Sequence, residues 1–121
     1  MIKITKRDFS PDEITRKMKK PEVGAVVSFI GIVRDDNIKG MKMEMYQEMA
    51  EKELKKLENN ARKRFDVNDV MIIHRYGRLK VGDNIILIAV SSAHRKDAFR
   101  TCEYLVDELK RVAPIWKEGI K

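Results

Sequence analysis

The chain has 121 residues, of which 43% are hydrophobic and 37% are charged. That length suits one domain, 1–121, with one sizeable core, and the composition excludes collagen-like, low-complexity and disordered proteins. Lys and Arg number 26 against 19 Asp and Glu, and the net charge of +7 predicts an anionic partner: nucleic acid, an acidic protein surface or a phosphorylated small molecule.

Cysteine content and apolar runs indicate where the protein works. The single cysteine, Cys102, leaves no intrachain disulfide, and the first residues lack the apolar stretch of a signal peptide. Both features favour a cytoplasmic location. The longest apolar run, 24–33, has about half of the roughly 20 residues that a membrane-spanning helix needs, so we expect no membrane association.

The first half of the chain predicts three strands and one helix. The strands cover 2–5, 25–33 and 41–46, and the almost continuously apolar 25–33 is typical of a central strand covered on both faces. Between the first two strands, the sequence SPDE supplies Ser10 as a helix N-cap and a proline at the first helical position. This helix should end before Pro21.

The second half predicts two longer helices and two strands. A helix over 47–65 presents one apolar face, and strands follow at 70–73 and 85–90. The last helix should run over 94–112, with a buried stripe of Ala98, Phe99, Cys102, Leu105, Val106, Leu109 and Val112. The order β-α-β-β-α-β-β-α predicts an α+β domain with a mixed, mainly antiparallel sheet and three helices.

Several kinds of chemistry are disfavoured by the residues present. His74 and His94 are the only histidines, and with Cys102 on an expected core face they are too few for a typical zinc site. The chain has no Walker loop and no GxSxG or GxGxxG motif, which argues against nucleotide hydrolysis and serine hydrolysis.

Two arginines follow strands in positions suited to an anion. Arg95, with His94, begins the last predicted helix, where free backbone N–H groups and the positive end of the helix dipole favour anions. Arg34 directly follows the strand 25–33, and guanidinium groups bind phosphate in a bidentate manner. The pattern fits a phosphate pocket, and it also fits ordinary charged residues at sheet edges.

A second cationic feature surrounds Pro114. Lys110 precedes this proline, and Lys117 directly follows Trp116. A lysine beside arginines and apolar surface can act as a base or a nucleophile. The alternative is a frayed tail in which Trp116 is packed only for burial.

Five segments, in order, resemble the large, catalytic subunit of molybdopterin synthase. They read GAVVSFIGIVR at 24–34, EMYQEMA at 44–50, HRYGRL at 74–79, SAHR at 92–95 followed by AF at 98–99, and LK at 109–110 with PIWK at 114–117. Together they extend over nearly the whole chain from residue 24 onward. Five such segments in one order are specific to that family.

The resemblance implies an α/β-hammerhead fold, a central homodimer, and a heterotetramer with two small ubiquitin-like sulfur-carrier subunits. The carrier's Gly-Gly tail ends in a thiocarboxylate, whose sulfur passes in two rounds to cyclic pyranopterin monophosphate and builds the dithiolene of molybdopterin. The family needs no metal or organic cofactor for this step. The expected activity is therefore sulfur transfer in molybdenum cofactor biosynthesis.

The same resemblance assigns residues by their position in the motifs. The expected substrate-binding set is Ile32, Val33, Arg34, His94, Arg95, Lys110, Lys117 and Glu118. Within it, Arg34 and the backbone before it would line the pocket, and His94 and Arg95 would hold the phosphate or the pterin. Lys110 and Lys117 match the family's two active-site lysines. Lys110 would act as acid–base or transient nucleophile, and Lys117 would orient the carrier's terminal carbonyl.

Two other functions compete with this interpretation. A basic nucleic-acid-binding α+β module would explain the charge, but aromatic residues make up only 7% of the chain and no strand carries paired aromatics for base stacking. A catalytically silent scaffold for the carrier is the other alternative. Lysines at the matching positions argue against it.

Overall fold

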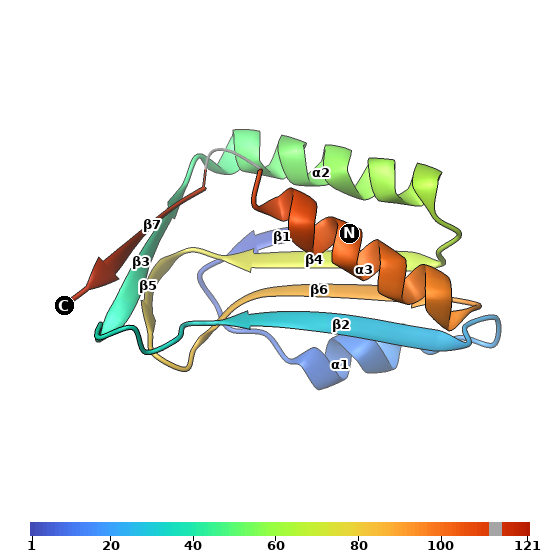
Figure 1. Cartoon of the computed structure of the whole chain (residues 1–121), viewed down its shortest axis with the longest axis horizontal. Coiled ribbons are helices and arrows are strands. Elements are labelled where there is room, and N and C mark those ends of the chain that lie inside the picture. Colours follow the sequence, from blue (N-terminus) through green and yellow to red (C-terminus); the bar gives the residue numbers. More distant parts are fainter. Residues whose placement is uncertain (112–114) are drawn as a thin grey trace.

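The computed structural model describes residues 1–111 and 115–121. Its elements run in the order β1 (Ile2–Thr5), α1 (Pro11–Lys17), β2 (Ala25–Ile32), β3 (Gly40–Met45), α2 (Gln47–Arg64), β4 (Asp69–Arg75), β5 (Gly77–Lys80), β6 (Asn84–Ser92), α3 (Arg95–Leu109) and β7 (Ile115–Ile120). The predicted α+β class, with three helices and mainly antiparallel strands, is confirmed in this part of the chain (Figure 1).

The main sheet has four strands in the order β1-β4-β6-β2. Strand β1 runs parallel to β4, while β6 is antiparallel to both β4 and β2. Strand β6 is buried from Ile86 to Ser92, as its apolar sequence predicts. Together with β4 it is one of the two inner strands on which both faces of the core are built.

Helices cover the two faces of this sheet unequally. Helices α2 and α3 lie over one face, and the short α1 lies over the other (Figure 1). Helix α2 buries the apolar face predicted for 47–65, formed by Ala50, Leu54, Leu57 and Ala61. Helix α1 begins as predicted, because the Ser10 hydroxyl accepts a hydrogen bond from the Glu13 N–H at 3.3 Å.

A second sheet, with strands in the order β5-β3-β7, stands at one end of the main sheet (Figure 1). Its strands are all antiparallel, and it packs through a small core of Val33, Met43 and Leu79. The sequence prediction missed β5 and β7. Both are short and neither contains a continuous apolar run, so their strand conformation comes from pairing with the distant β3 rather than from a local pattern.

Two predictions about burial are wrong. Strand β2 is an edge strand rather than a central one, and its Phe29 and Ile32 are 38% and 53% exposed. Phe99, expected in the buried stripe of the last helix, is 61% exposed, whereas Cys102 is buried as predicted. An apolar pattern does not distinguish a side chain covered by its own chain from one left at the surface. Helix α3 ends at Leu109, and Val112 and Pro114 lie outside the described residues.

Candidate functional site

The loop that carries Arg34 is anchored by the residue before it. Val33 is buried, its N–H donates to the Asp83 carbonyl at 2.9 Å, and its own carbonyl accepts from the Gly82 N–H at 2.8 Å. Arg34 itself is exposed, and its Nε donates to Asp36 Oδ2 at 3.0 Å. An exposed ion pair of this kind is worth at most about 1 kcal/mol, so an anionic ligand can displace Asp36 at little cost.

Strand β7 gives Lys117 and Glu118 opposite directions. In the β3–β7 register Lys117 is paired with Met43, and Glu118 is paired with Lys42. Residues that are paired across two strands point to the same face of the sheet, and successive residues of one strand point to opposite faces. Lys117 therefore stands on the same face as the buried Met43, and Glu118 stands on the outer face. The face of Met43 packs against Val33, which precedes Arg34. Lys117 and Arg34 therefore lie at the same end of the molecule, and Glu118 points away from the side that bears Lys117.

Lys110 lies at this end as well. It is exposed and forms the C-cap of α3, whose C-terminal end points toward the end of the molecule that carries the three-stranded sheet (Figure 1). Lys110 and Lys117 thus come from the end of a helix and from the strand that follows it. The expected lysine pair therefore lies at the same end of the molecule as Arg34, and three exposed cations at one end favour the approach of anionic groups.

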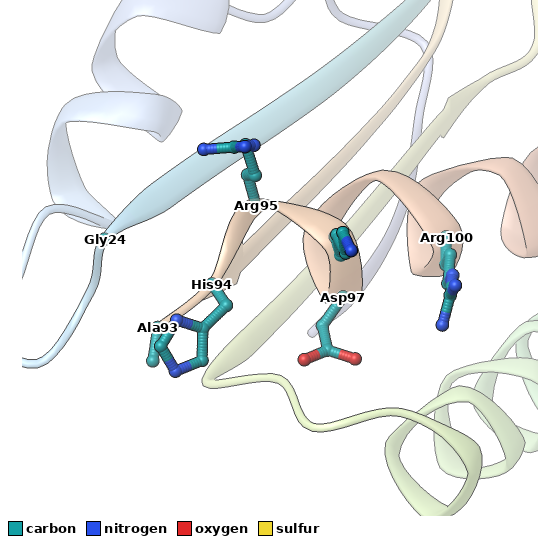
Figure 2. Close-up of a pocket in the computed structure, with 7 residues that line it drawn as sticks. Gly24, Ala93, His94, Arg95, Asp97 and Arg100 are labelled. Carbon is teal, nitrogen blue, oxygen red and sulfur yellow. The ribbon is translucent and has the colours of Figure 1, made fainter.

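His94 and Arg95 lie at a different cavity. The start of α3 borders a cavity of about 570 Å³ lined by Gly24, Ala93, His94, Arg95, Lys96, Asp97 and Arg100. Figure 2 shows the Arg95 side chain on one side of the helix start and those of His94 and Asp97 on the other. Arg95, Lys96 and Arg100 outnumber the single carboxylate of Asp97, so the cavity favours an anion. The sequence analysis did not single out Lys96 and Arg100. Both follow Arg95 within five residues of the same predicted helix, so the cluster of cations could have been noticed.

A glycine makes this helix start possible. The Gly24 N–H donates to the Ser92 carbonyl at 2.9 Å, and a Cβ at Gly24 would overlap the carbonyl oxygen of Ala93. Only glycine allows the start of β2 to approach the turn before α3 this closely. The His94 N–H donates to Ser92 Oγ at 3.3 Å, which fixes the same turn from the other side.

The two groups of candidate residues lie at opposite ends of the main sheet. Strands β2 and β6 are antiparallel, and their register runs from Ala25 paired with Ser92 to Ile32 paired with Asn84. Seven residue steps of ~3.3 Å separate the two ends by about 23 Å. The expectation that Arg34 and Arg95 share one phosphate pocket is therefore not met within one copy of the chain. The sequence placed both after strands, but it did not reveal that these strands run in opposite directions.

In the part of the chain that the structure describes, neither the cysteine thiol nor a metal site adds a further reactive group. Cys102 is buried, and burial raises the pKa of its thiol to about 11, which makes it a poor nucleophile. Among residues 1–111 and 115–121, no group of three or more His, Cys, Asp or Glu could hold a metal ion. Within the same residues, no helix is long and apolar enough to cross a membrane.

Comparison with known proteins places these features in a family. The family described as MoaE protein matches residues 4–112. A curated molybdopterin synthase catalytic subunit of Thermoplasma volcanium is 36% identical, over 98% of this chain and 90% of its own length. The crystal structure of molybdopterin synthase from Staphylococcus aureus is 34% identical, with a TM-score of 0.91, and covers 98% of this chain and 89% of that one.

A further similar structure contains two different subunits. It is a protein–protein complex of subunits 1 and 2 of the molybdopterin-converting factor of Helicobacter pylori, matched at 26% identity with a TM-score of 0.83. The match covers 98% of this chain and 83% of that one. The fold at this level of similarity is therefore found in a chain that assembles with another subunit.

Proposed function

The chain belongs to the MoaE protein family, and from that membership we propose that it acts as the catalytic subunit of a molybdopterin synthase. In this role it transfers sulfur from the C-terminal thiocarboxylate of a small ubiquitin-like carrier to cyclic pyranopterin monophosphate. In each round a carbon–sulfur bond forms at a carbon of the pterin side chain while a carbon–oxygen bond to the same carbon breaks, and the carrier's own carbon–sulfur bond is cleaved by water. The carrier leaves as a carboxylate, and two rounds build the dithiolene.

The observation that carries this proposal is the joint position of Lys110, Lys117 and Arg34. All three are exposed cations at one end of the molecule, and both the carrier tail and the pterin substrate are anions. Lys117 would donate a hydrogen bond to the carrier's terminal carbonyl, where negative charge develops as the carbon–sulfur bond is cleaved. Lys110 would transfer a proton or attack an intermediate, and Arg34 would hold the phosphate.

A homodimer, which the family resemblance implies, would account for the distant cavity at His94 and Arg95. Strand β2 is an exposed edge with apolar Phe29 and Ile32, which is a surface suited to pairing with another strand. A two-fold contact would pair two β2 strands antiparallel. The start of β2 in one copy, next to His94 and Arg95, would then meet the end of β2 in the other, next to Arg34. The complete substrate site would thus form between two copies.

The carrier subunit completes the assembly. Two copies of this chain would each bind one carrier, which makes a heterotetramer. The two-subunit complex of the Helicobacter pylori relative supports a carrier partner for this chain. The cytoplasmic location and the independence from metal and organic cofactors stay predictions from the sequence and the family.

Reconstitution with purified components tests the proposal. The protein is mixed with thiocarboxylated carrier and cyclic pyranopterin monophosphate, and molybdopterin is measured as its fluorescent oxidation product. We expect the wild type to form product, and we expect Lys110→Ala to abolish it while carrier binding changes little. Lys117→Ala should lower the rate by about 100-fold or more, because it removes a donor to the developing negative charge.

The matched control is Lys80→Ala, an exposed lysine on β5 outside the candidate site. It should retain the wild-type rate. Arg34→Ala should chiefly raise the KM for the pterin substrate. A wild-type protein that binds carrier but forms no product would favour the scaffold function, and a Lys110→Ala variant with wild-type activity would remove that lysine from the mechanism.

A further inference from the structure

The loop that carries Arg34 is held at both ends by one turn. This β2–β3 loop comprises residues 33–39, and the turn, residues 80–83, joins β5 to β6 at the same end of the molecule (Figure 1). At the start of the loop, the Val33 N–H donates to a carbonyl of the turn at 2.9 Å, and the Val33 carbonyl accepts from an N–H of the turn at 2.8 Å. At the end of the loop, the Lys39 carbonyl accepts from another N–H of the turn at 3.5 Å. The conformation of the turn therefore determines where the loop begins and ends.

One carboxylate and one glycine define this turn. The Asp83 N–H donates to the Lys80 carbonyl at 2.9 Å, and Asp83 Oδ2 accepts from the Lys80 N–H at 2.8 Å. Between them, Gly82 has a φ of +90°, which is typical of the third residue of a type II turn and is rarely adopted by residues with a side chain. The Asp83 side chain thus adds a second bond across the turn, and both Lys80 groups in these bonds belong to the backbone.

The end of the β2–β3 loop is also joined to the strand that carries Lys117. The Lys39 N–H donates to the Ile120 carbonyl at 2.7 Å. Ile38 packs closely against Gly119, where a Cβ would lie 2.9 Å from Ile38 Cγ2. Ile120 and Gly119 belong to β7, as Lys117 does. The turn and β7 together therefore place the loop relative to Lys117.

The position of Arg34 depends on this backbone. In the described part of the chain, the Arg34 side chain is exposed and bonds only to the exposed Asp36. Val33, by contrast, is buried and has both its backbone groups bonded to the turn. A backbone that is fixed in advance reduces the conformational entropy that Arg34 loses when it binds a ligand.

We propose that Asp83 is a positioning residue for Arg34: its carboxylate fixes the turn, and the turn holds the β2–β3 loop where Arg34 binds the phosphate of the pterin substrate. This assignment rests on the proposed function. Asp83 acts through the backbone, and its own negative charge would repel the phosphate. Arg34 binds the phosphate rather than the reacting carbon atoms, so its misplacement weakens substrate binding. The KM for the pterin substrate then rises while the kcat changes little.

Steady-state kinetics of two turn variants test the assignment. Rates of molybdopterin formation are measured with saturating thiocarboxylated carrier and varied cyclic pyranopterin monophosphate, after thermal unfolding has shown each variant to be folded. Asp83→Ala removes the bond to the Lys80 N–H and should raise the KM about threefold to tenfold, with the kcat within about twofold of wild type. Gly82→Ala should raise the KM as well, because its Cβ meets no other atom and strains only the backbone at the φ of +90°.

Asp83→Asn is the matched control for the charge. Its amide oxygen can still accept from the Lys80 N–H, so its KM should stay close to that of wild type although the same negative charge is lost. Loss of the charge alone would favour an anionic substrate and lower the KM. Lys80→Ala keeps both backbone groups and should also have the wild-type KM. A general loss of stability would reduce the amount of folded enzyme, which lowers the apparent kcat and leaves the KM unchanged.

A double variant separates positioning from a general structural role. If Asp83 acts through Arg34, the double variant of Arg34→Ala and Asp83→Ala should have the KM of Arg34→Ala alone. Amide hydrogen exchange of the free protein checks the structural link, because the Val33 N–H should exchange faster in Asp83→Ala than in wild type.

The outcomes distinguish this assignment from the proposed function. An unchanged KM in Asp83→Ala, effects that multiply in the double variant, or equal exchange of the Val33 N–H would each overturn the role of Asp83, while the proposed function stands. No product from the wild type would overturn the proposed function, and the role of Asp83 with it.

Discussion

At the scale of single residues, His74 is a buried histidine that the proposed mechanism does not use. Its side chain lies in β4, and its Nδ1 is 2.8 Å from the Arg75 carbonyl oxygen, a position in which Nδ1–H donates. Burial lowers the pKa of His74 below the usual 6.5, and the Arg75 carbonyl only partly opposes this shift. The folded protein therefore keeps His74 neutral at a pH where the unfolded chain already binds a proton.

This difference predicts an acid-sensitive stability. Because the folded pKa is lowered, the contribution of His74 is complete above about pH 6.5 and is lost as the pH falls through the folded pKa. We expect the free energy of unfolding, measured with urea, to be lower at pH 5.5 than at pH 7.5. In His74→Leu the difference between these two pH values should shrink, and in the control His94→Gln it should stay. A full pH dependence in His74→Leu would assign the acid sensitivity to other groups.

At the scale of elements, the close approach of β2 to the turn before α3 depends on Gly24. Gly24→Ala adds a methyl group against the Ala93 carbonyl, which is backbone and cannot move aside like a side-chain tip. We expect a loss of about 1–3 kcal/mol in the free energy of unfolding. Urea unfolding of Gly24→Ala and of its exposed neighbour variant Glu22→Ala measures this effect. Equal stability of the two variants would contradict the contact.

The elements also show which features the sequence can predict. The periodic apolar face of α2, the Ser10 cap of α1 and the buried β6 follow from local patterns, and the structure has all three. Strands β5 and β7 have no such local pattern. They form because they pair with β3, which is distant in the sequence. Their absence from the prediction hid the fact that Lys117 and Glu118 belong to a strand and therefore stand on opposite faces.

At the scale of the whole molecule, the candidate site is divided between two ends. Lys110, Lys117 and Arg34 lie at one end, and His94 and Arg95 lie about 23 Å or more away at the other, because β2 and β6 are antiparallel. The motifs identified these residues one by one, but strand direction and edge position are properties of the assembled sheet. The proposed homodimer is what joins the two groups into one site.

The most direct test of the account mixes two variants that are each expected to be impaired when the pterin substrate is limiting. Arg34→Ala and Arg95→Ala proteins are each assayed alone for molybdopterin formation with thiocarboxylated carrier and pterin precursor, and then after unfolding and refolding together in equal amounts. A shared site predicts that half of the dimers are mixed and that each mixed dimer has one intact site, so about a quarter of the wild-type activity should return. No recovery in a mixture with proven exchange of subunits would contradict the shared site, and no product from the wild type itself would contradict the catalytic function.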